Sequence, residues 1–142
     1  MIFTPLTIKA MQLSYEAHHG QKDKCGVPYV FHPYRVAEAQ KDEYAVCAAL
    51  LHDTVEDTWV TPEHLEQMGF PDEVVSAVRL LTHDKKVPYM EYVRKIKQNS
   101  IAKAVKLADL HDNMNTGRLD KVDEAALKRL EKYREAEKLL LE

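Results

Sequence analysis

Histidine and aspartate side chains from three separate segments could together hold one metal ion. The pair His52 and Asp53 follows a run of apolar residues, 45–51. A histidine upstream, His32, precedes a proline, and Asp109 lies downstream in a mostly apolar stretch. Burying ionisable side chains costs several kcal/mol unless they are paired or bound to a metal. Imidazoles and carboxylates together favour ions such as Mn²⁺, Fe²⁺, Co²⁺ or Zn²⁺ and leave coordination positions for water. The pattern predicts metal-assisted hydrolysis of a phosphate ester.

Two further acids follow the His-Asp pair. Glu56 comes four residues after His52, and Asp57 comes four residues after Asp53. If the helix that carries the pair continues, each acid lies on the same face as the residue four positions before it. A carboxylate there could take a proton from a metal-bound water or give one to a leaving group. We therefore favour a functional role for both acids over a solvated helix end.

The composition indicates a single helical domain. The chain has 142 residues, of which 45% are hydrophobic, and only four are glycines and six prolines. Stretches rich in Ala, Leu, Glu and Lys favour helices. The two cysteines, Cys25 and Cys47, are too few for a disulfide framework. No stretch approaches the roughly 18 apolar residues of a membrane span, so a cytoplasmic protein is predicted.

Proline, glycine and capping residues divide the chain into seven or eight expected helices. The third, 43–54, is apolar on nearly every side, which indicates a central buried helix. The last, 123–141, carries an apolar stripe that could pack inward or against a second subunit, so both a monomer and a homodimer stay open. We predict an all-α bundle with helices near 5–20, 32–41, 43–54, 61–69, 71–82, 88–98, 100–115 and 123–141.

The segments around these residues resemble the HD superfamily of metal-dependent phosphohydrolases. The closer resemblance is to the hydrolase domain of RelA/SpoT-type alarmone enzymes and to the small alarmone hydrolases. The similar segments occur in the family's order: Ala-His-His-Gly-Gln at 17–21, Gly-Val-Pro-Tyr-Val-Phe-His-Pro at 26–33, Ala-Ala-Leu-Leu-His-Asp-Thr-Val-Glu-Asp-Thr at 48–58, and Val-Lys-Leu-Ala-Asp at 105–109. A His-Asp doublet alone is a weak signal, whereas these segments together are specific.

The resemblance implies a site, a reaction and a domain assignment, which is a single HD-domain phosphohydrolase over residues 1–142. It implies a Mn²⁺ site, with Fe²⁺, Co²⁺ or Zn²⁺ as other candidates, at His32, His52, Asp53 and Asp109. It implies that Glu56 and Asp57 are the catalytic acids. It implies substrate contacts at Lys24, Asn113 and Thr116. The implied reaction removes pyrophosphate from the 3′ position of guanosine 3′,5′-bis(diphosphate), (p)ppGpp, and gives GDP or GTP. A synthetase domain cannot fit in this length, so synthesis is not expected.

Several residues on the phosphate side of the expected pocket qualify this resemblance. Asp23 stands where the family commonly has a basic residue, and His111 and Asp112 crowd Asp109 in a way that the family does not require. Arg35 and Lys106 are further cations that could offset phosphate charge. Tyr133 could contact a substrate, although packing in the core is its expected role.

The sequence can be compared with three other functions. The first is an HD phosphohydrolase for a nucleoside monophosphate, a cyclic nucleotide or another pyrophosphate. The second is a nucleotide-sensing module without catalysis, which the presence of every expected ligand disfavours. The third is nucleic-acid binding, which we do not expect because the net charge is −3 and no basic stripe with interleaved aromatics occurs.

Overall fold

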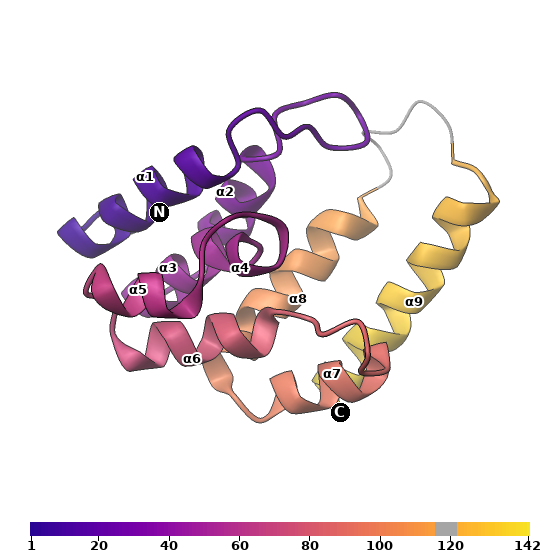
Figure 1. Cartoon of the computed structure of the whole chain (residues 1–142). Helices are drawn as coiled ribbons and strands as arrows, with labels where there is room; N and C mark the ends of the chain where they lie inside the picture. The colour runs from indigo at the N-terminus through magenta and orange to yellow at the C-terminus, as the bar shows by residue number, and fades with distance from the viewer. Residues whose placement is uncertain (116–121) are drawn as a thin grey trace.

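Helices make up most of the computed structural model, which describes residues 1–115 and 122–142 (Figure 1). The helices are α1 (Pro5–Ala17), α2 (Phe31–Glu38), α3 (Glu43–Leu51), α4 (Thr54–Asp57), α5 (Pro62–Gln67), α6 (Asp72–Leu81), α7 (Tyr89–Lys97), α8 (Ser100–Met114) and α9 (Glu124–Leu141). The described residues contain no strand, only an isolated bridge between Lys22 and Pro28. The predicted all-α class is confirmed. Within the described ranges, eight helices correspond to predicted ones, and α4 is an additional single turn.

The helix α3 is buried because nearly all of its side chains are apolar. Every residue from 45 to 51 is buried, and α3 contacts α1, α2, α6 and α8, which enclose it in Figure 1. Removing this much apolar surface from water is the main stabilising contribution to the fold. The chain that leaves α3 therefore begins its next segment inside the protein, and that segment carries His52.

Local capping fixes where several helices begin. The side chain of Thr61 accepts a hydrogen bond from the His64 N–H at 3.1 Å, and Pro62 occupies the first helical position. Asn99 caps α8 in the same way, through a bond of 2.9 Å from the Ala102 N–H. Such caps satisfy N–H groups that have no partner within the helix. The register of α8, which carries Asp109, is set at this end.

The last helix, α9, packs on α7 and α8. Its buried side chains are Ala126, Ala136 and Leu140, whereas the apolar residue Leu127 is exposed. Part of the predicted stripe is therefore buried within the chain. Within the described residues, no helix is both long and apolar enough to cross a membrane.

Candidate metal centre and its pocket

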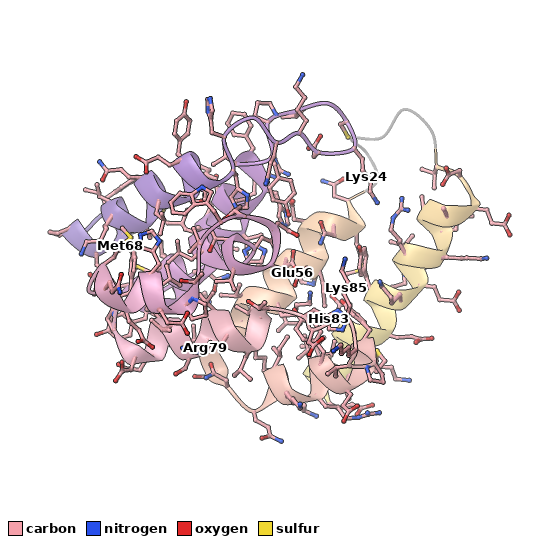
Figure 2. The ribbon with its side chains drawn as sticks, in the orientation of Figure 1. Lys24, Glu56, Met68, Arg79, His83 and Lys85 are labelled. Atoms are coloured by element: carbon pink, nitrogen blue, oxygen red, sulfur yellow. The ribbon has the colours of Figure 1, made fainter. Side chains whose placement is uncertain are left out.

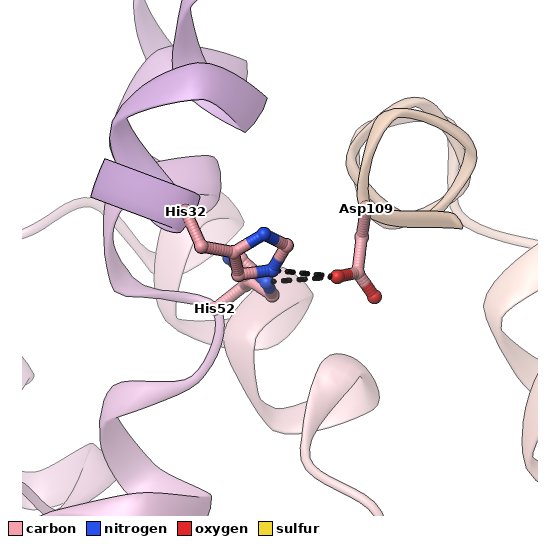
Figure 3. Close-up of side chains that lie close together, drawn as sticks. All are labelled: His32, His52 and Asp109. Atoms are coloured by element: carbon pink, nitrogen blue, oxygen red, sulfur yellow. Dashed lines mark hydrogen bonds and ion pairs between the residues drawn. The ribbon is translucent and has the colours of Figure 1, made fainter. Parts of the chain in front are cut away.

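Three helices bring histidine and aspartate side chains to one point inside the protein. His32 lies in the first turn of α2, His52 follows α3 directly, and Asp109 lies on α8. All three are buried, and one potential ligand atom from each lies within 4.8 Å of the other two. Figure 3 shows both imidazoles facing the carboxylate of Asp109. This spacing suits three ligands of a single ion.

Asp53 joins these three from the turn after α3. Its Oδ2 atom lies 3.1 Å from Nε2 of His52 and 3.6 Å from Nε2 of His32. The Tyr29 hydroxyl donates a hydrogen bond to the same oxygen at 2.5 Å. Burial opposes ionisation of Asp53, but the neighbouring His52 outweighs it and lowers the pKa of this carboxyl to about 2. We call His32, His52, Asp53 and Asp109 the His-Asp cluster; their role as ligands stays a prediction.

One buried nitrogen shows that the cluster fits a cation. Nδ1 of His52 donates to the backbone carbonyl of Ala49 at 2.6 Å, so Nε2 is the ring nitrogen that faces the cluster. Nε2 is buried and, among the described residues, makes no well-aligned hydrogen bond; its nearest polar neighbours are carboxylate oxygens of Asp53 at 3.1 Å and of Asp109 at 3.5 Å. Buried polar atoms without a partner are rare in folded proteins. A divalent ion bound by this nitrogen and the nearby carboxylates would satisfy it.

Asp109 is held on α8 by several donors. Its Oδ1 accepts from Asn113 at 3.0 Å and lies 2.9 Å from His32 Nε2, and its Oδ2 accepts from Lys106 at 3.0 Å. Burial would raise the pKa of Asp109, but the Lys106 ammonium holds it well below its usual range. Lys106 is itself buried and lies over the ring of Tyr92. Lys106 was a candidate for offsetting phosphate charge, but in the structure its ammonium group forms an ion pair with Asp109.

His32 has a second carboxylate neighbour that the sequence analysis did not recognise as part of the site. Its Nδ1 atom lies 2.6 Å from Asp112 Oδ2. Arg35 donates to both oxygens of Asp112, at 2.7 Å and 2.9 Å, so Arg35 is engaged here rather than at a phosphate. The available signal was the spacing, because Asp112 follows Asp109 by three residues and therefore shares its helix face.

The helix that leads into the His-Asp pair does not continue unbroken through the two acids, in line with the predicted end near residue 54. The helix α3 ends at Leu51 and α4 begins only at Thr54. The Thr54 hydroxyl donates to the Leu51 carbonyl at 2.8 Å, which gives the backbone a local alternative to the helical bond. The turn of α4 still places Asp57 after Asp53, since the Asp57 N–H donates to the Asp53 carbonyl at 3.0 Å.

Glu56 and Asp57 are exposed at the edge of the cluster, and each is anchored from another part of the chain. The Glu56 carboxylate accepts from the His83 backbone N–H at 2.7 Å, and Figure 2 shows these two residues side by side. The Gln21 side chain donates to the Asp57 carbonyl at 3.0 Å. Partial burial, with the charges of Asp53 and Glu56, raises the pKa of Asp57 to about 6. Asp57 can therefore exchange a proton near neutral pH.

A pocket of about 390 Å³ opens beside the cluster. It is bounded by His32 and Tyr29 on one side and by α9 on the other. Its walls include, in chain order, Lys22, Asp23, Lys24, Tyr29, His32, Asp112, Asn113, Arg129 and Tyr133. Two of the three predicted substrate residues, Lys24 and Asn113, thus line the pocket (Lys24 is labelled in Figure 2). The third, Thr116, lies outside the described residues.

The pocket wall is cationic because of two lysines and a residue of α9 that sequence reasoning missed. Burial, together with the charge of Arg129, lowers the pKa of Lys24. Like charges held near each other indicate a place for an anion. Tyr133, which follows Arg129 by one helical turn, packs partly against the core and also lines the pocket. The sequence indicates the place of Arg129 only through its spacing of four residues from Tyr133, which puts both on one face of α9.

Comparison with known proteins assigns the chain to a family. The profile described as the HD domain matches residues 10–112. The chain belongs to the HD-domain family. The matched range includes the whole His-Asp cluster and both acids of α4, whereas α9 lies beyond it.

Several curated proteins are similar to this HD-domain chain. A guanosine-3′,5′-bis(diphosphate) 3′-pyrophosphohydrolase of Aquifex aeolicus is 35% identical over 120 residues, which cover 76% of this chain and 17% of that protein. MESH1 of Danio rerio, named as the same kind of pyrophosphohydrolase, is 38% identical over 119 residues, which cover 75% of this chain and 66% of MESH1. The putative chloroplastic GTP diphosphokinase RSH1 of Arabidopsis thaliana is 47% identical over 64 residues, and the chain spans only 7% of its length.

The likeness also holds in three dimensions. A solved structure described as a metazoan ortholog of SpoT that hydrolyses ppGpp superposes with a TM-score of 0.75 at 30% identity. The match covers 99% of this chain and 85% of that one. The similarity therefore extends past the HD-domain match to α9, the helix that closes the pocket.

Proposed function

We propose that this chain is a metal-dependent phosphohydrolase that removes the 3′-pyrophosphate of (p)ppGpp, giving GDP or GTP and pyrophosphate. The observation that carries the proposal is the buried His-Asp cluster beside a cationic pocket of about 390 Å³. The names of the Aquifex and Danio relatives and the activity of the metazoan ortholog support the same substrate.

The metal part of the proposal rests on the donor set. Nε2 of both histidines and one oxygen each of Asp53 and Asp109 would hold one divalent ion, with Mn²⁺ favoured and Fe²⁺, Co²⁺ or Zn²⁺ as alternatives. When bound, such an ion lowers the pKa of a coordinated water and offsets charge on phosphoryl oxygens. The Tyr29 hydroxyl orients Asp53, and Lys106 and Asn113 orient Asp109.

The proton chemistry falls to the acids of α4. Asp57, whose pKa is raised to about 6, would carry a proton to the 3′ oxygen of the departing nucleotide. Glu56 would accept the proton of the attacking water, held in place by its bond from the His83 N–H. Acid–base catalysis of this kind contributes about 10²–10⁴-fold.

The cationic wall would hold the polyphosphate. Lys24, with Lys22 and Arg129, would contact phosphate oxygens through charge-assisted hydrogen bonds, and Asn113 would contact the substrate from the α8 side. A substrate contact by Thr116 stays a prediction of the resemblance. Asp23 is the acid on this wall, and its Oδ1 accepts from the backbone N–H groups of Cys25 and Val27 at 2.8 Å and 3.0 Å. Those bonds shape the loop that presents the two lysines.

We further propose a cytoplasmic enzyme, monomeric or homodimeric, that acts on free nucleotides rather than on nucleic acid or at a membrane. The support is chemical. The net charge is −3, while the basic side chains named above gather at one pocket instead of forming a long stripe.

Turnover with product identification tests the proposal. Purified protein with Mn²⁺ should convert ppGpp into GDP and pyrophosphate. Asp53→Ala should lower this turnover by more than about 10³-fold because a ligand and its charge are lost, whereas Glu73→Ala, an exposed acid on α6, should leave it unchanged. Full activity of Asp53→Ala would exclude the assigned site. Release of only orthophosphate from nucleoside monophosphates would favour a different HD phosphohydrolase.

A further inference from the structure

We propose that Asp112 is a positioning residue for His32 and that Arg35 holds Asp112 in place; the inference rests on the metal-binding part of the proposed function. Nε2 of His32 faces the cluster, 2.9 Å from Asp109 Oδ1. Nδ1, on the other edge of the ring, lies 2.6 Å from Asp112 Oδ2. A carboxylate oxygen accepts, so Nδ1 donates its proton to Asp112, and Nε2, which faces Asp109 in the cluster, would be the nitrogen that binds a cation in the metal-loaded protein.

Arg35 fixes the orientation of the Asp112 carboxylate. Its Nε donates to Oδ1 at 2.7 Å and its Nη2 donates to Oδ2 at 2.9 Å. A planar guanidinium that engages both oxygens sets the direction of the carboxylate as well as its distance. The Asp112 side chain is only 12% exposed. It cannot turn away from His32 without breaking both bonds to Arg35.

The second imidazole of the cluster is oriented by a weaker kind of acceptor. His52 Nδ1 donates to the neutral backbone carbonyl of Ala49, whereas His32 Nδ1 donates to an anion. A carboxylate partner makes an imidazole more basic and strengthens its bond to a metal. The Arg35 charge offsets that of Asp112, so the pair adds little net negative charge beside a pocket that must admit phosphates.

Each of two helices carries one proposed metal ligand and, three residues later, one residue that helps to orient His32. On α2, Arg35 follows His32 by three residues, and on α8, Asp112 follows Asp109 by three. Residues at this spacing share a helix face, and α2 packs against α8. Asp112 therefore joins the two helices at the level of the cluster.

Metal affinity is the first test. Mn²⁺ would be titrated into the full chain and unbound ion measured by electron paramagnetic resonance. Asp112→Asn and Asp112→Ala should raise the dissociation constant by about 10–100-fold, and Arg35→Gln should raise it by less, because the carboxylate remains. The matched control is Glu66→Gln, which breaks an exposed 3.3 Å contact with Arg79 and should leave the constant unchanged.

The position of the imidazole proton is the second test. In Zn²⁺-loaded protein labelled with ¹⁵N, we expect a protonated, slowly exchanging Nδ1 at His32 that is lost in Asp112→Ala. The signals of His52 serve as an internal reference, because its acceptor is a backbone carbonyl. If Asp112→Ala does not fold, Asp112→Asn and Arg35→Gln decide the matter.

The outcomes separate this inference from the proposed function. Wild-type protein that binds neither ion would overturn both. Wild-type protein that binds, with Asp112 variants at the same dissociation constant and with the His32 signal unchanged, would overturn only the role of Asp112 and Arg35.

Discussion

The folded protein shifts the pKa of the Asp57 side chain toward neutral pH. Partial burial and the neighbouring charges of Asp53 and Glu56 raise its pKa from an ordinary 3.8 to about 6. Because the folded-state value lies above the unfolded one, ionised Asp57 opposes folding above about pH 6. That opposition fades as the pH falls toward 3.8. A residue that destabilises its own fold at working pH is typical of a functional site.

This linkage gives a prediction about activity and stability together. Asp57→Asn should lower turnover of ppGpp by about 10²-fold or more. It should also raise the free energy of unfolding of the metal-free protein at pH 7 by on the order of 1 kcal/mol, reduced from the full shift because the group is solvent-exposed. The gain should vanish near pH 4. Urea unfolding at several pH values would measure it.

The control for this prediction is an acid of similar exposure away from the cluster. Glu16→Gln, on the exposed side of α1, should change neither turnover nor the pH dependence of unfolding. An Asp57→Asn protein that keeps full activity would remove Asp57 from the proton chemistry, whatever its stability.

At the scale of elements, α9 lies beyond the HD-domain match and contributes the far wall of the pocket. Arg129 should bind polyphosphate in the ground state and the transition state alike. Arg129→Gln and Lys24→Gln should therefore each raise KM by about tenfold, equivalent to about 1.4 kcal/mol, with little change in kcat. Steady-state kinetics on ppGpp would measure both constants. Lys128→Gln, an exposed neighbour on α9, should behave as wild type. A loss confined to kcat would contradict the binding role.

Helix starts could be predicted from the sequence because their causes are local. Thr61 and Pro62 act within one turn, and the structure places the α5 start there. The interruption between α3 and α4 could not be predicted in the same way. It depends on a hydrogen bond from the Thr54 hydroxyl to the Leu51 carbonyl. This bond replaces hydrogen bonds to water only when the segment is buried in the folded protein.

The sequence predicts those residues of the candidate site whose local context is unusual, but it does not predict contacts between distant segments. His52 and Asp53 stand out because an ionisable pair follows a fully apolar helix. The contact of Arg35 with Asp112 joins α2 to α8 across more than seventy residues of chain, and only the packing of those helices creates it. Arg129 was missed for the same reason, since the approach of α9 to the loop of Lys24 is a tertiary contact.

At the scale of the whole molecule, the fold brings one buried cluster together from three helices, and one of its residues, His32, lines the cationic pocket. The structure departs from an ordinary core here, because ionisable side chains replace apolar ones at the junction of α2, α3 and α8. Such a junction is stable only if the charges are neutralised by one another or by a cation. Within the described residues, Nε2 of His52 makes no well-aligned hydrogen bond although carboxylates surround it, and this arrangement favours the cation.

The most direct measurement is a crystal structure of Mn²⁺-soaked protein with anomalous scattering recorded at the manganese edge. We predict one strong peak bonded to Nε2 of His32 and of His52 and to an oxygen each of Asp53 and Asp109. A peak elsewhere, or none at saturating Mn²⁺ while the same side chains bond only to one another, would contradict the proposed site.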